Sequence, residues 1–144
     1  MAGSFRQFDH TGDVGVEAEA PDLDSLFMRC AEALFDVLSF AGDYGEEGLV
    51  PVEVRAPDLE ALLVRWLGEL LYLHDTARWV FIRFVPVITE EIGAGWVLKG
   101  TAHGEKFDPS RHRLKTELKA VTYHQAVVAR EDGGTWRARV VFDI

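Results

Sequence analysis

The sequence has a single cysteine and no long uninterrupted hydrophobic run. One cysteine excludes an internal disulfide and cannot form a thiolate metal site by itself, and the apolar spacing around Cys30 predicts that it packs inside a helix. The most leucine-rich stretch is interrupted by Arg65 and Glu69, and the first ten residues contain no apolar run. We therefore expect neither a signal peptide nor a transmembrane span, and a cytoplasmic protein.

Short motifs that by themselves indicate a catalytic or nucleotide-binding site are also missing. There is no GxxxxGK phosphate-binding loop, no GxSxG nucleophile elbow and no HExxH zinc spacing. The sequence therefore gives no support to a nucleotide hydrolase, a serine hydrolase or a zinc protease, and we predict that the protein is not a self-sufficient enzyme.

Charge is unevenly distributed along the 144 residues, whose formal net charge is −9. Residues 1–72 contain 4 basic and 15 acidic side chains, whereas residues 73–144 contain 11 basic and 9 acidic ones. An acidic surface repels phosphate backbones, so we expect no direct nucleic-acid binding. Cation binding, or docking on a basic partner, is compatible with this charge. The length and the 48% apolar content predict one globular domain over residues 1–144.

Two amphipathic helices are predicted, each preceded by an aspartate suited to cap it. Asp22 and Asp58 each precede leucines at helical spacing. The tetrapeptide APDL occurs at 20–23 and again at 56–59, which indicates two strand–helix units of similar design. His74 falls on the apolar face of the second helix, where we expect a satisfied core residue or a cation at the helix C-terminus rather than a metal ligand.

The rest of the chain alternates with the period of β-strands. These stretches are 5–8, 14–20, 50–54, 79–85, 95–102, 118–129 and 135–142. We predict an α+β two-layer sandwich, with a mostly antiparallel or mixed sheet of about six or seven strands and two helices on one face. The order of the strands in the sheet does not follow from the sequence.

A polar turn near the N-terminus, Asp9-His10-Thr11-Gly12-Asp13, is the first candidate site. Aspartate and glycine form turns for backbone reasons, so an ordinary turn is the simplest interpretation. The last residues of the sequence, however, favour a metal site over an ordinary turn. The strand-like run VVFDI ends one residue after Asp143, so the Asp143 side chain and the Ile144 carboxylate are close by covalent necessity.

Asp13, Asp143 and Ile144 could together supply three oxygen ligands to a hard divalent cation. Calcium is favoured because it accepts six to eight oxygens, and magnesium or manganese is possible. The site requires the last strand to lie beside the first hairpin. Three negative charges clustered without a cation would destabilise one another.

The chain resembles the archease family in several long segments. They are DHTGDVG at 9–15, LLYLHDT at 70–76, GEKFDPSRHRLKTELKAVTYH at 104–124 and the ending WRARVVFDI. The combination covers nearly the whole chain and is far more specific than any single segment. Gly12 departs from the family, which more commonly has alanine there.

The resemblance implies a protein cofactor of the RtcB-type RNA ligase, which joins RNA ends in tRNA splicing and RNA repair through a guanylated histidine. It implies that the protein promotes ligase guanylation, allows multiple turnover and broadens nucleotide use without being an enzyme itself. It also implies a metal site at Asp13, Asp143 and Ile144. Asp36, Lys119 and His10 are weaker candidates for contact with the ligase.

A second interpretation keeps the same residues but makes the protein an enzyme. A metal-dependent phosphoester hydrolase could use Asp13 and Asp143 as ligands and His10 as a general base. A third possibility is a module that binds substrate RNA, which the acidic first half disfavours. The basic stretch 111–119 could receive a phosphate or an acidic protein, although most such runs are simply solvated.

Overall fold

The structure is a computed structural model that describes residues 2–10, 12–40, 42 and 44–144. It contains two helices and seven strands, and every strand pairing is antiparallel. In chain order the elements are β1 (Ser4–His10), β2 (Asp13–Ala20), α1 (Leu23–Leu38), β3 (Gly48–Ala56), α2 (Leu59–Ala77), β4 (Trp79–Glu91), β5 (Gly95–Lys106), β6 (Ala120–Arg130) and β7 (Trp136–Asp143).

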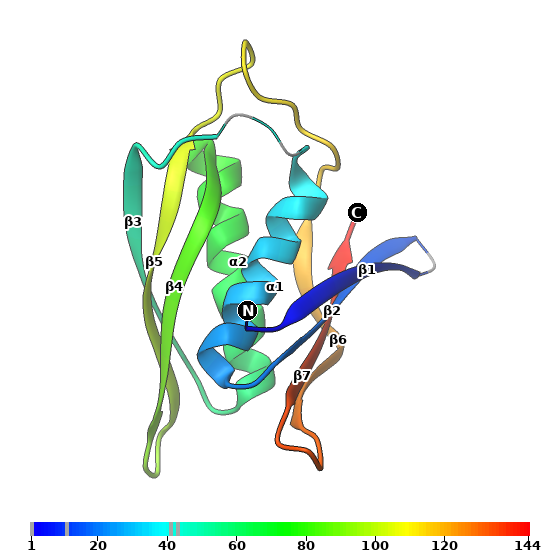
Figure 1. Ribbon diagram of the computed structural model, residues 1–144, viewed down its shortest axis with the longest axis vertical. Coiled ribbons are helices and arrows are strands. Elements are labelled where there is room, and N and C mark those ends of the chain that lie inside the picture. Colours follow the sequence, from blue (N-terminus) through cyan, green and yellow to red (C-terminus); the bar gives the residue numbers. More distant parts are fainter. Residues whose placement is uncertain (1, 11, 41, 43) are drawn as a thin grey trace.

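The strands form two sheets, with the helices between them (Figure 1). One sheet has the order β1-β2-β7-β6 and the other has the order β3-β5-β4. The predicted α+β class, the two helices and the expectation of about six or seven mostly antiparallel strands are confirmed. The strands nevertheless divide into two sheets instead of forming one, and each sheet covers its own side of the helical layer.

The apolar residues of the helices explain why two sheets are needed. Leu62, Leu63 and Val64 are three consecutive buried positions of α2, so more than one face of this helix must leave water. α2 packs on β3 on one side and on β6 on the other, and α1 packs likewise between β4 and β2. A single sheet would leave part of each apolar surface exposed.

Both predicted helix caps are confirmed. The side chain of Asp22 accepts a hydrogen bond from the backbone N–H of Ser25 at 2.8 Å, and Asp58 accepts one from Ala61 N–H at 2.8 Å. Both caps have extended backbone angles, as is usual at this position. Each aspartate therefore satisfies one of the N–H groups that the first turn leaves without a helical partner.

In both strand–helix units, an acidic residue in the first turn of the helix accepts a backbone hydrogen bond from a strand outside that unit. Asp24, two residues after the first cap, accepts a hydrogen bond from Ile88 N–H of β4 at 2.8 Å. Glu60, at the equivalent position of α2, accepts one from Val128 N–H of β6 at 3.0 Å. The repeated design that APDL suggested thus extends to the contacts that each helix makes with a sheet.

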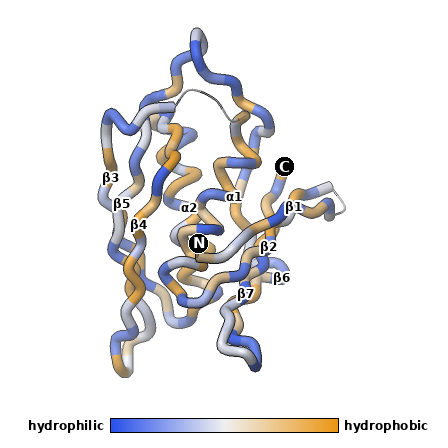
Figure 2. Tube along the Cα trace, viewed as in Figure 1, coloured by the Kyte–Doolittle hydropathy of each residue, from blue (hydrophilic) through white to orange (hydrophobic). Residues whose placement is uncertain are grey.

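The core lies between the helices and the inner faces of both sheets. Trp66 is completely buried, and its indole N–H donates to the Phe27 carbonyl at 3.1 Å, which joins α2 to α1. Cys30 is buried in helix α1 as predicted, and burial raises the pKa of its thiol to about 12. Figure 2 shows hydrophobic residues along both helices and the strands that face them.

The connection from β5 to β6, residues 107–119, passes from one sheet to the other across the ends of the helices (Figure 1). It is mainly hydrophilic (Figure 2). Two backbone hydrogen bonds attach this connection to the end of α1. Lys115 N–H donates to the carbonyl of Leu38, the last residue of α1, at 2.8 Å, and Phe40 N–H, two residues after the helix, donates to the Arg113 carbonyl at 3.0 Å. Neither helix of the described chain is long and apolar enough to cross a membrane.

Candidate functional site

Asp13 and Asp143 are directly opposite each other on the neighbouring strands β2 and β7. Because directly paired residues of an antiparallel ladder project to the same face, their Cβ atoms are expected about 5 Å apart. The row continues with the backbone of His10 on one side and Ala120 on the other. Strand order, which the sequence did not provide, therefore brings together the two ends of the chain.

The hairpin that presents Asp13 has a tight turn between β1 and β2. Gly12 has φ +72°, in the left-handed region that glycine enters without steric cost. Thr11 and the side chain of His10, both part of the predicted polar turn, lie outside the residues that the structure describes.

The electrostatics of the Asp13–Asp143 pair favour a cation. Like charges directly opposite on a ladder destabilise it, and a divalent ion would remove that repulsion. Asp143 is exposed and Asp13 is half-buried, so both are positioned at the surface of the sheet. Ile144 follows directly and is 43% exposed.

The donor set fits a hard cation held by few protein ligands. In the described part of the chain, no three His, Cys, Asp or Glu side chains are close enough together to hold a metal ion. Two aspartates with a neighbouring terminal carboxylate would leave most of a calcium or magnesium coordination shell to water or to a partner. Such a site is open, in contrast with the closed cages of structural metals.

Of the weaker candidates for contact with a partner, Lys119 adjoins the Asp13–Asp143 pair and Asp36 does not. Lys119 N–H donates to the Asp143 carbonyl at 2.8 Å, so the backbone of Lys119 adjoins the pair and its exposed side chain starts from there. Asp36 lies on α1 and accepts a hydrogen bond from the Gln7 side chain at 2.6 Å. Asp36 thus contacts β1, but it is not part of the Asp13–Asp143 row.

A second polar cluster was not predicted from the sequence. Glu105 and His112 are each only 3% exposed, and His112 Nε2 lies 2.5 Å from Glu105 Oε1. The backbone N–H of Asp108 donates to His112 Nδ1 at 2.8 Å, so in the neutral ring it is Nε2 that donates to the carboxylate. Arg111 adds an ion pair to the same oxygen at 2.9 Å.

Burial by itself would raise the pKa of Glu105. Hydrogen bonds from His112 and from Gly45 N–H, together with the charge of Arg111, outweigh burial and lower that pKa below its ordinary value. The ionised carboxylate therefore fastens residues 107–112 to β5. Arg111 and His112, at the start of the basic stretch, therefore help to stabilise the fold. A histidine among charged residues soon after a strand was the sequence signal that could have indicated this role.

Comparisons with known proteins find relatives that match this chain over nearly its entire length. The model of the Archease protein family (MTH1598/TM1083) matches residues 5–144. A protein archease of Pyrococcus furiosus is 40% identical over 140 residues, which cover 97% of this chain and 98% of that protein. A protein archease of Sulfolobus acidocaldarius is 37% identical over 140 residues, with the same coverage.

A solved structure extends the likeness from sequence to fold. The solution structure of protein 1598 of Methanobacterium thermoautotrophicum superposes with a TM-score of 0.82 and is 37% identical. The match covers 98% of this chain and 99% of that one. On the family match and on these relatives, the chain belongs to the archease protein family.

Proposed function

We propose that this protein activates an RtcB-type RNA ligase in the cytoplasm, in tRNA splicing and RNA repair. It promotes guanylation of the ligase, permits multiple turnover and broadens nucleotide use, and it does so as a non-catalytic partner. Membership of the archease family and the position of Asp13 opposite Asp143 support this proposal.

The observation that carries the proposal is the pairing of these two aspartates at the end of a sheet. β2 and β7 are far apart in sequence, and their register places Asp13 and Asp143 in the same row. A cross-strand pair of like charges is unfavourable, and a bound cation would offset that repulsion. A site of so few ligands can share its ion with oxygen groups of another molecule.

Asp13, Asp143 and Ile144 would hold the divalent ion, with calcium favoured and magnesium or manganese possible. When bound, the ion would supply positive charge at the surface where the protein meets the nucleotide site of the ligase. The protein residues would orient that charge, because the ladder register places both aspartates in one row at the end of the central strands β2 and β7. Lys119 adjoins the site through its backbone and could add a contact with the ligase.

The test is guanylation of the cognate ligase under multiple-turnover conditions, at a fixed concentration of divalent ion. Wild-type protein should increase the amount of guanylated ligase formed with time. Asp13→Asn and Asp143→Asn should each remove most of the increase, because asparagine keeps the size of the side chain but loses its charge.

Asp132→Asn is the matched control. Asp132 is an exposed aspartate in the turn between β6 and β7, at the far end of the strand that carries Asp143, and it should stimulate as wild type does. Full stimulation by both site variants would contradict the proposal. Hydrolysis of phosphoesters by the isolated protein, abolished by chelation, would instead favour the metal-dependent hydrolase.

A further inference from the structure

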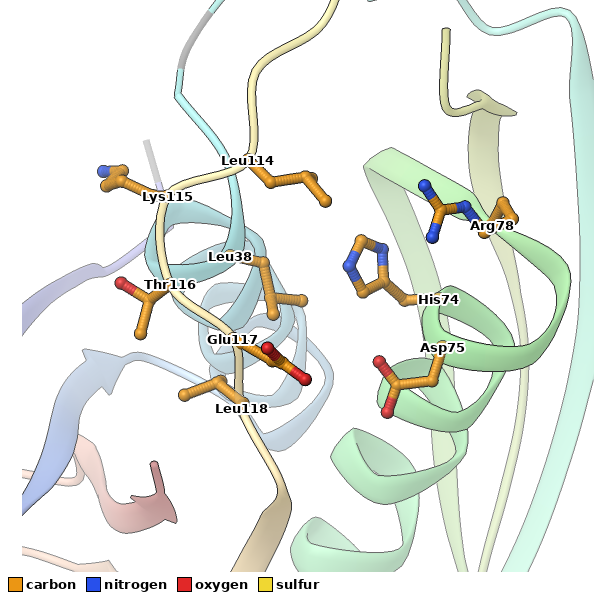
Figure 3. Close-up of a pocket in the computed structure, with 9 residues that line it drawn as sticks. All are labelled: Leu38, His74, Asp75, Arg78, Leu114, Lys115, Thr116, Glu117 and Leu118. Atoms are coloured by element: carbon orange, nitrogen blue, oxygen red, sulfur yellow. The ribbon is translucent and has the colours of Figure 1, made fainter. Parts of the chain in front are cut away.

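A pocket of about 470 Å³ lies where both helices end, between α2 and residues 114–118 of the connection (Figure 3). α1 ends at Leu38 and α2 ends at Ala77, and both Leu38 and the last turn of α2 line the pocket. The C-terminal end of a helix carries a partial negative charge, so two such ends at one pocket favour a positively charged occupant.

Two carboxylates add to this negative potential. Asp75, from α2, and Glu117, from the connection, point toward one another across the pocket (Figure 3). Both side chains are exposed, and neither makes a hydrogen bond or an ion pair with any residue that the structure describes. Two unpaired carboxylates on opposite walls are suited to bind one cation between them.

His74 provides a further hydrogen-bond acceptor in the pocket. This side chain is 9% exposed, and its Nδ1 lies 2.8 Å from the Trp79 carbonyl. A carbonyl only accepts, so Nδ1 carries the hydrogen and, in the neutral ring, Nε2 is an acceptor. Figure 3 shows the imidazole extending toward Leu38 and Leu114, and Nε2 has no hydrogen-bond partner among the described residues.

Two basic residues also line the pocket, and each lies near an aromatic ring. The guanidinium of Arg78 lies 5.1 Å from the centroid of the Phe107 ring, and the ammonium of Lys115 lies 5.1 Å from that of Phe40. Neither Arg78 nor Lys115 forms an ion pair with Asp75 or Glu117. The two carboxylates therefore remain available to a ligand.

We propose that this pocket receives an arginine side chain presented by a protein partner. Leucines from α1 and the connection would cover the aliphatic part of the side chain, and the two carboxylates and His74 Nε2 would accept from the guanidinium. Arginine is favoured over lysine because its planar fork has five donors, enough for three separate acceptors. This inference goes beyond the proposed function and does not depend on it.

The test is NMR titration of the isotope-labelled full-length protein with N-acetyl-arginine-methylamide. We expect saturable shifts of the His74 ring and of the amides of residues 114–118, with a Kd in the range of about 1–10 mM, ordinary for an isolated side chain. The citrulline analogue, which has the same shape without the charge, should bind at least tenfold more weakly.

Two sets of variants identify the groups responsible. Asp75→Asn combined with Glu117→Gln should weaken arginine binding at least tenfold, whereas Asp132→Asn combined with Glu90→Gln changes two exposed carboxylates elsewhere and should leave it unchanged. The amide spectrum and melting temperature of each variant check that the fold is intact.

Three results would overturn the inference. They are equal binding of the citrulline analogue, absence of saturable shifts up to about 50 mM arginine derivative, and saturation of the same resonances by inorganic phosphate in preference to arginine. The last result would assign the pocket to anions through Arg78 and Lys115.

Discussion

At the scale of single residues, the pairing of Asp13 with Asp143 favours cation binding but lowers the stability of the cation-free fold. The ladder register fixes both carboxylates on one face, and their mutual repulsion lowers the stability of that end of the sheet. Without a bound cation, replacing one of these two aspartates with a neutral residue would therefore raise the free energy of unfolding. The pair therefore predicts that stability and cation binding change in opposite directions when one aspartate is neutralised.

Asp143→Asn should stabilise the cation-free protein slightly and abolish its stabilisation by calcium. In buffer with a chelator, relief of repulsion should raise the free energy of unfolding by about 0.2–1 kcal/mol. Calcium should raise the melting temperature of the wild type, because binding to the folded state stabilises it by mass action, but not that of the variant. Differential scanning calorimetry with and without calcium measures both effects.

The control for this experiment is Asp132→Asn, which should respond to calcium as wild type does. An equal calcium-induced rise in the melting temperature of wild type and Asp143→Asn would show that the ion binds elsewhere.

The residues of the candidate site were identified from the sequence, but their geometry was not. Asp13 and Asp143 stood out by residue type and by resemblance, whereas their pairing depends on β2 lying next to β7. Such non-local pairing is not encoded in any local pattern. The Glu105–His112 pair was missed because a buried hydrogen bond between side chains of β5 and the following connection leaves no periodic signal in the sequence.

At the scale of elements, the two helices begin by the same device. The capping hydrogen bonds of Asp22 and Asp58 have equal lengths of 2.8 Å, and each cap precedes a helix that packs between two sheets. The local sequence pattern predicted where both helices begin, because capping involves only residues that are neighbours in the sequence. The division of the strands between two sheets followed instead from the breadth of the apolar faces.

Loss of either cap should destabilise the protein by a similar amount. Asp22→Ala and Asp58→Ala should each lower the free energy of unfolding by about 1 kcal/mol, the usual cost of removing an aspartate N-cap. Urea denaturation measures this cost. Asp22→Ser and Asp58→Ser, which keep an acceptor oxygen, should recover most of the loss, and recovery in neither case would assign the cost to something other than the cap.

The Glu105 cluster predicts how stability depends on acid. The pKa of Glu105 is lowered in the folded protein, so its contribution is present above the ordinary value of 4.5 and is lost as the pH falls through the folded value. Glu105→Gln should therefore be less stable than wild type at pH 7, and the difference should narrow below pH 4.5.

Urea unfolding at several pH values between neutrality and acid would follow that difference. Glu90→Gln, which changes an exposed glutamate of β4, controls for a general effect of charge. A difference between wild type and Glu105→Gln that stays constant with pH would show that ionisation of Glu105 does not contribute to folding.

At the scale of the whole molecule, the connection 107–119 links the regions where chemistry is expected. It is fastened to β5 by the Glu105 cluster and to α1 by backbone bonds, and it ends beside Asp143. Residues 114–118 of the connection line the pocket of Figure 3, and the candidate cation site lies at the end of the connection. One segment thus borders both surfaces proposed to contact other molecules.

The central claim is that Asp13 and Asp143 act as one site in ligase activation. The most direct measurement is a double-mutant comparison of ligase guanylation with Asp13→Asn, Asp143→Asn and the variant carrying both, at a fixed concentration of divalent ion. Residues that act as a unit are non-additive, so the double variant should lose no more stimulation than either single variant. Full stimulation by either single variant, or losses that multiply in the double variant, would contradict the claim.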